Sequence, residues 1–218
     1  MYYDALKGDH GLPYNPFKSL VVPRPIGWIS TMSRDGVVNL APYSFFNALS
    51  YDPAFVMISS GSREDGSPKD TALNAEETGE FVFNMANWDL RNQMTETALI
   101  VEPRVDEMKA AGLTAAKSNV VKPPRVAEAP VSFECLYHQT VVLPGNKPEH
   151  VHHVVFGKVI GIHIKDEFIN EKGLVDVLKI RPIARLGYKD YTSIESVFSL
   201  QKRTPEDDLK PAASQAAE

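Results

Sequence analysis

The segment "NLAPYSFFNALSYDPAFVMISSG", residues 39–61, combines polar side chains with a dense set of aromatic rings. Its second half, at 54–60, predicts a largely buried strand. Its first half does not show the regular alternation of apolar and polar residues that is typical of a strand with one buried face. The Asp35-Gly36 pair just before the segment is typical of a hairpin turn, which predicts antiparallel strands on either side of it. Three early strands in hairpin order favour an antiparallel β fold over alternating strands and helices.

The rest of the chain adds more strands than helices. Further strands are predicted at 80–86, 131–143 and 152–164, and helices at about 67–79, 87–99 and 104–113. Six or more strands with few helices indicate a mainly β fold, a barrel or sandwich with peripheral helices. We expect an N-terminal arm at 1–20, one domain at 21–200 and a disordered polar tail at 201–218.

The first helix carries specific start and stop signals. Ser67 is expected to cap it, Pro68 to occupy its first position, and Asp70 to complete a capping box. Gly79 is expected to end it. Between 37 and 46 we expect a strand in which Pro42 withholds one ladder hydrogen bond.

Composition excludes several classes of function. The chain has 218 residues and a formal net charge of -5, without a dense Lys/Arg block, so no nucleic-acid partner is expected. No apolar run approaches the ~20 residues that cross a bilayer, so no membrane partner is expected. One cysteine, Cys135, excludes an internal disulfide, and the N-terminus lacks a secretory signal. We expect a cytoplasmic protein with Cys135 packed and inert.

The loop "SSGSREDGSPKDT", residues 59–71, leaves a buried strand and enters a helix. Exposed N–H groups at a helix N-terminus attract phosphate, and the loop adds cationic and hydroxyl side chains. Its candidate contacts are Ser59, Ser60, Gly61, Ser62, Arg63, Lys69, Asp70 and Thr71. Because no GxGxxG fingerprint is present, a mononucleotide phosphate is favoured over a pyrophosphate. The alternative is a solvated loop whose charges only maintain solubility.

The segment at 41–47 offers groups for a flat heterocycle. Ser44 and Asn47 both donate and accept hydrogen bonds, and Tyr43, Phe45, Phe46 and Trp28 offer apolar ring surface. The alternative is that the rings belong to the core and the polar groups cap a turn. Together with the phosphate loop, this segment indicates a flat aromatic nucleotide such as FMN.

The histidines of "EHVHH" (149–153) are the remaining candidates. On a strand, His150 and His152 share a face while His153 points away, so a metal site would lack ligands. We predict no metal and a single histidine beside a ligand pocket, with a surface cluster as the alternative.

Several segments in order resemble the flavin reductase-like family of FMN-binding split-barrel proteins. The resemblance runs from about Val21 to Tyr191 through "NLAPYS", "KDTALNAEETGEFV", "HHVVFGKV" and "ARLGY". It implies a Greek-key split β-barrel, a homodimer with FMN near the interface, and redox chemistry with NAD(P)H.

The resemblance also implies roles for individual residues. Ala41, Pro42, Tyr43 and Ser44 would line the flavin ring, with Asn47 at its polar edge and Trp28 and Thr31 in the pocket wall. Ser60, Lys69 and Thr71 resemble phosphate contacts, and Arg63 lies where a basic residue is common. His152 would face the flavin or the nicotinamide as the catalytic histidine, and Arg185 and Tyr188 would complete the pocket.

The leading hypothesis is therefore an NAD(P)H-dependent flavin reductase that binds FMN and supplies reduced flavin to a partner monooxygenase or another acceptor. A flavin-storage protein without turnover is the alternative from another class. A metal-dependent β-barrel using the histidine cluster, or another flat cofactor such as haem, stays open at this point.

Overall fold

A computed structural model describes residues 1–99, 105–147 and 149–200, and the predicted tail at 201–218 lies outside them. The strands are β1 (Arg24–Pro25), β2 (Gly27–Met32), β3 (Val38–Tyr43), β4 (Phe46–Tyr51), β5 (Ala54–Gly61), β6 (Glu80–Met85), β7 (Ala115–Ala116), β8 (Arg125–Val126), β9 (Val131–Leu143), β10 (His152–Ile164), β11 (Ile183–Gly187) and β12 (Asp190–Ser193). The helices are α1 (Asp70–Thr78), α2 (Arg91–Glu96), α3 (Glu107–Ala110) and α4 (Val177–Ile180), with 3-10 turns η1 (Phe17–Ser19) and η2 (Asp166–Phe168). None of the helices described is long and apolar enough to cross a bilayer.

Seven antiparallel strands form the main sheet in the order β3-β2-β6-β9-β10-β5-β4. Its two edge strands, β3 and β4, are separated in sequence by only Ser44 and Phe45. A chain this short spans roughly 10 Å, so the two edges must lie close together and the sheet must curl into a barrel. The Ser59 N–H donates to the Phe45 carbonyl at 2.8 Å, which extends the β4–β5 pairing into this short connection. The barrel is therefore split between β3 and β4, as the resemblance implied.

Two hydrophobic clusters flank the wall formed by β2 and β3. The first fills the barrel and consists of Ile29, Tyr43, Phe46, Val56, Ile58, Ala72, Ala75, Phe81, Phe83, Cys135 and Val155. Ala72 and Ala75 come from α1, which packs its small side chains against this interior. The second cluster joins Trp28 and Leu40 to Met94 of α2 and Met108 of α3. Helices α2 and α3 are thereby held on the outer side of the wall.

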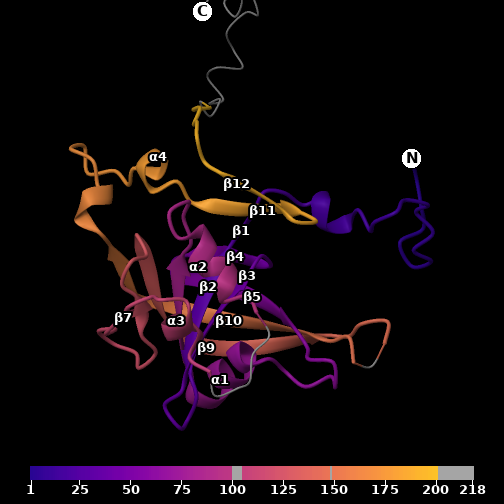
Figure 1. The fold of residues 1–218 in the computed structure, drawn as a ribbon, viewed down its shortest axis with the longest axis horizontal. Helices are drawn as coiled ribbons and strands as arrows, with labels where there is room; N and C mark the ends of the chain where they lie inside the picture. The colour runs from indigo at the N-terminus through magenta and orange to yellow at the C-terminus, as the bar shows by residue number, and fades with distance from the viewer. Residues whose placement is uncertain (100–104, 148, 201–218) are drawn as a thin grey trace, which may run out of the picture.

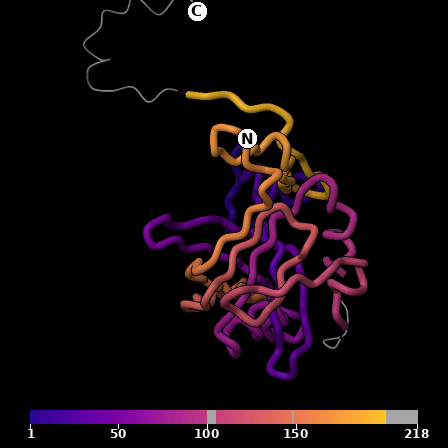
Figure 2. Tube along the Cα trace, turned by 90° about the vertical axis from the view of Figure 1, so that its left-hand side faces the viewer, coloured from indigo at the N-terminus to yellow at the C-terminus, as the bar shows by residue number. Residues whose placement is uncertain are grey.

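A smaller sheet, in the order β1-β11-β12, lies beyond one side of the barrel. Figures 1 and 2 both show the N-terminal segment beside the β11–β12 hairpin, at the top of each view. Strand β1 pairs with β11 so that Arg24 lies opposite Arg185. The predicted arm thus leads directly into a strand that pairs with a late hairpin.

Most predicted elements are present, and four predictions differ from the structure. The predicted cap at Ser67 is wrong: the Ser67 N–H and O–H both donate to Asp65 Oδ1, and α1 begins at Asp70 without a side-chain cap. The strand predicted at 37–46 ends at Tyr43, because the chain bends there to cross the barrel opening into β4. The helix predicted at 87–99 is confined to Arg91–Glu96. The helix predicted at 104–113 is present only at Glu107–Ala110. Gly79 ends α1 in the left-handed region, with φ 76°, as predicted.

Candidate functional site

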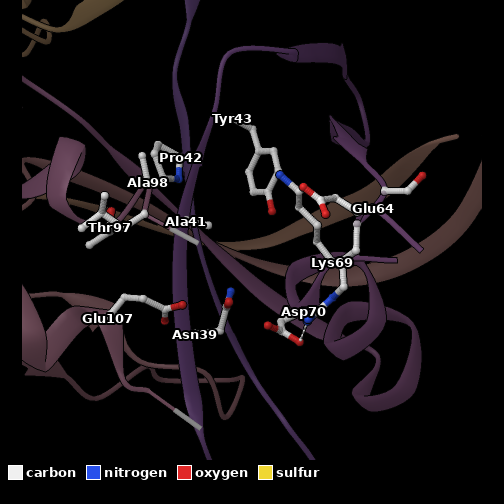
Figure 3. Close-up of a pocket in the computed structure, with 13 residues that line it drawn as sticks. Asn39, Ala41, Pro42, Tyr43, Glu64, Lys69, Asp70, Thr97, Ala98 and Glu107 are labelled. Atoms are coloured by element: carbon white, nitrogen blue, oxygen red, sulfur yellow. Dashed lines mark hydrogen bonds and ion pairs between the residues drawn. The ribbon is translucent and has the colours of Figure 1, made fainter. Parts of the chain in front are cut away.

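A cavity of about 500 Å³ lies where β3, the loop after β5 and the segment after α2 meet (Figure 3). Its lining residues are Asn39, Ala41, Pro42, Tyr43, Ser62, Arg63, Glu64, Lys69, Asp70, Thr97, Ala98, Leu99 and Glu107. These residues come from three separate parts of the sequence. A cavity of this volume is in the usual range for small-molecule and cofactor sites.

The first wall of the cavity is β3, an edge strand of the sheet. An edge position tolerates Pro42, which has no N–H to donate. The side-chain amide of Asn39 donates to Thr71 Oγ1 at 2.9 Å and to Thr31 Oγ1 at 3.2 Å. Among the described residues nothing donates to the Asn39 side-chain oxygen, so the buried network behind the wall leaves an acceptor on the cavity side. Ala41 and Pro42 provide small apolar surface against which a flat ring can lie.

The second wall is the loop that joins β5 to α1. The Ser62 N–H and O–H both donate to the Val151 carbonyl, at 2.9 and 2.6 Å, which fixes the loop to the start of β10. Arg63 forms an ion pair with Asp70, the first residue of α1. Lys69 is the residue before this nine-residue helix, and its side chain rises toward Tyr43 in Figure 3. Cationic groups and free helix N–H groups therefore gather at this end of the cavity.

The third wall was not predicted from the sequence. Thr97, Ala98 and Leu99 follow α2, and Glu107 opens α3. The Trp28 indole N–H donates to Thr97 Oγ1 at 2.8 Å, so the buried Trp28 supports this wall from behind. No local motif marks these residues, because only packing against β3 brings them to the cavity.

Two ionisable groups in the cavity have shifted pKa values. Burial raises the pKa of the Tyr43 phenol, although hydrogen bonds to Thr71 and Ser60 oppose the shift. Burial also raises the pKa of the Glu107 carboxyl, and the Leu40 N–H, which donates to Glu107 Oε2 at 3.0 Å, opposes it. Both shifts favour the neutral form in a partly desolvated space.

The predicted site residues divide into three groups. Those that line the cavity are Ala41, Pro42, Tyr43, Arg63, Lys69 and Asp70. Those in the polar layer behind the lining are Trp28, Thr31, Ser60 and Thr71. Those that do not line it are Ser44, Asn47, Ser59, Gly61, His152, Arg185 and Tyr188. Six lining residues were absent from the predicted contacts: Asn39, Glu64, Thr97, Ala98, Leu99 and Glu107. Ser62 also lines the cavity and was predicted only as a hydroxyl donor of the loop.

His152 lies at the start of β10, beside β5 rather than in the cavity lining. Its Nδ1 is 3.1 Å from Ser59 Oγ, and its ring meets the edge of the Phe45 ring at a centroid distance of 6.0 Å. Burial lowers the pKa of His152, and nearby Lys18 and Lys69 lower it further. The neutral imidazole is therefore the favoured form.

Arg185 and Tyr188 belong to the β11–β12 hairpin. The Arg185 guanidinium donates to the Tyr191 hydroxyl and the Tyr188 carbonyl. Tyr188 is half exposed and stands beside Tyr14 of the N-terminal segment. Asn47 is exposed on β4, and its side-chain oxygen accepts the Ala48 N–H. Among the described residues, no three His, Cys, Asp or Glu side chains come together as a metal-binding group.

Comparisons with a family model, with related sequences and with solved structures all match most of the chain. The model of the flavin reductase like domain matches residues 19–181. An uncharacterized protein of Aquifex aeolicus is 44% identical over 191 residues, which cover 88% of this chain and 94% of that protein. The crystal structure of nitrilotriacetate monooxygenase component B from Bacillus cereus aligns with a TM-score of 0.84 and 28% identity, covering 92% of this chain and 98% of that one. A Shewanella frigidimarina protein assigned as a flavin reductase with a split barrel domain aligns with a TM-score of 0.74 and 21% identity, covering 86% and 90%.

Proposed function

Because the chain belongs to the flavin reductase-like family, we propose that it is an FMN-dependent oxidoreductase that takes a hydride from NAD(P)H. The observation that supports this function is that the cavity has cationic groups at one end and an apolar wall beside them. One end carries Arg63, Lys69 and the start of α1, which suit a single phosphate, and the β3 wall offers apolar surface for a flat ring. The donor set therefore fits FMN.

The protein's own part in such a reaction is binding and orientation. When bound, FMN would supply the hydride-accepting ring. Lys69 and Arg63 would hold its phosphate, and Asp70 would keep Arg63 in place through their ion pair. Ala41, Pro42 and Tyr43 would support the ring. His152, Arg185 and Tyr188 lie outside this cavity, and we propose that the neutral His152 imidazole contacts the nicotinamide instead.

The physiological context is also proposed. The Bacillus cereus neighbour is component B of a monooxygenase, which supports delivery of reduced flavin to a partner oxygenase. We further propose a homodimer, a cytoplasmic location, and a flavin-binding unit at 21–200 preceded by an arm at 1–20. The family match at 19–181 supports the start of this unit.

Replacing a phosphate-binding lysine tests the proposal. Lys69→Ala should weaken FMN binding about tenfold, because one charge-assisted hydrogen bond contributes about 1.5 kcal/mol. Quenching of FMN fluorescence on titration measures the affinity. Lys158→Ala is the matched control, because Lys158 is exposed on β10 and does not line the cavity. Equal affinities in the two variants would contradict the phosphate assignment.

A kinetic assay separates the enzyme from a flavin-storage protein. The purified protein with excess FMN should oxidise NADH or NADPH in repeated turnovers. Binding of FMN without oxidation of either nucleotide would instead support storage.

A further inference from the structure

Glu107 is an acidic side chain on the wall of a cavity whose other end suits an anion. It opens α3, which packs against β3, and its Oε2 accepts the Leu40 N–H at 3.0 Å. Within the described residues no Lys, Arg or His pairs with this carboxylate. In Figure 3, Glu107 and Asn39 lie on one side of the cavity and Lys69 and Glu64 on the other. A phosphate held by Lys69 would therefore leave Glu107 toward the ring.

The charges that face Glu107 come from several elements. Asp70 of α1 and Asp106, the N-cap residue of its own helix, both act on it as like charges. Asp70 is partly neutralised by Arg63, and β3 contributes the uncharged Asn39 and Tyr43. Partial burial, and to a smaller extent the like charges, raise the pKa of Glu107 above its usual value. A further negative charge in the cavity would raise it again.

We propose that Glu107 binds a proton from solvent when the flavin in this cavity is reduced, and releases it when the flavin is reoxidised. This inference rests on the proposed function. A hydride carries two electrons and one proton, so its transfer to a neutral ring adds one negative charge to the cavity. Glu107 as a carboxylate would repel that charge, whereas protonation to the neutral acid removes the repulsion. One solvent proton enters for each two-electron reduction and leaves on reoxidation.

The pH dependence of the flavin midpoint potential tests this role. Reduction of the native protein with bound FMN should take up about two protons per two electrons in the pH range where Glu107 is ionised beside oxidised flavin and protonated beside reduced flavin. In Glu107→Gln the uptake should fall to about one, so the slope of potential against pH should about halve. The glutamine carbonyl still accepts the Leu40 N–H, which preserves the fold of α3.

Two further variants sharpen the comparison. Glu64→Gln removes the other unpaired cavity carboxylate, which is exposed and screened by solvent, and should keep the native slope. Glu107→Asp retains a carboxyl group and should keep most of the native slope, so a slope lost only in Glu107→Gln reports loss of the carboxyl group and not of the wild-type side chain in general.

The two possible failures are distinguishable. Equal slopes in native protein and Glu107→Gln, with both binding FMN, would overturn this inference and leave the proposed function intact. A native protein that does not alter the potential of added FMN at any pH would overturn the proposed function, and this inference with it.

Discussion

His152 combines a hydrogen-bond partner, an aromatic neighbour and nearby cations in one small region. Ser59 and Phe45 contact its ring, and Lys18 from the N-terminal segment acts on it electrostatically. Loss of hydration and the cations both disfavour the imidazolium. The region can therefore present a neutral hydrogen-bonding ring near pH 7, which suits an uncharged amide better than an anion.

NMR titration of the histidine ring protons should show His152 with a pKa below 6.5, its ordinary value. Lys18→Ala should move that pKa upward. Between the lowered native pKa and the unfolded-state value, the unfolded chain binds more protons, so stability should rise with pH through this window. A His152 pKa at or above the ordinary value would show that its surroundings do not exclude charge.

For individual residues of the cavity, the sequence predicted some and missed others for a physical reason. Tyr43 and Lys69 lie in local patterns, an interrupted strand and a polar loop entering a helix, whose chemistry is visible in neighbouring residues. Glu107 and Thr97 lie in ordinary helical sequence. Their positions depend on packing of α2 and α3 against Trp28 and Leu40, which no short window encodes.

Strand β10 faces a ring of the barrel core at Gly157. A Cβ built there would lie 2.1 Å from Cζ of Phe81, whose ring is fully buried. Phe81 fills the space that a side chain at 157 would need. The register of β10 against β9 also shifts between Phe156 and Gly157. The glycine is thus required by the close approach of a strand to a core ring.

Gly157→Ala should therefore destabilise the protein by about 1–3 kcal/mol, because the Phe81 ring must leave its position in a packed core. Urea unfolding followed by circular dichroism measures the loss. Gly61→Ala is the matched control on β5, since its added Cβ would meet His152 at 3.7 Å, an ordinary contact. Similar stabilities for the two variants would contradict the assignment of this steric role.

Strands and helices were predicted best where a long run of residues fits only one type of secondary structure. The strands at 131–143 and 152–164 have the bounds that the sequence predicted, because two long β-type runs on either side of a turn favour a hairpin. The helix start at Ser67 was wrong because Asp65 competes for the serine, and Arg63 binds the Asp70 that would complete the box. Hydrogen bonds to neighbouring side chains therefore took the place of the capping box that the sequence predicts.

Closure of the whole molecule depends on the quoted segment at 39–61. Its sequence predicts two strands and a bend but not that the bend joins opposite edges of a seven-stranded sheet. That relation also requires β9, which begins more than fifty residues after the end of this segment, to pair with both β6 and β10. The resemblance supplied the barrel topology that periodicity alone left as a barrel or sandwich.

The proposed homodimer is tested at the end of the β9–β10 hairpin, where Val141, Val142 and Leu143 are exposed apolar residues. Val142 is 55% exposed, and a second subunit would bury it. Val142→Glu should shift the mass measured by light scattering from dimer toward monomer, because a carboxylate in an apolar interface is costly. Leu174→Glu, at an apolar residue that is 60% exposed before α4, should leave the dimer intact. A native monomer, or a Val142→Glu dimer of unchanged affinity, would place the interface elsewhere or exclude it.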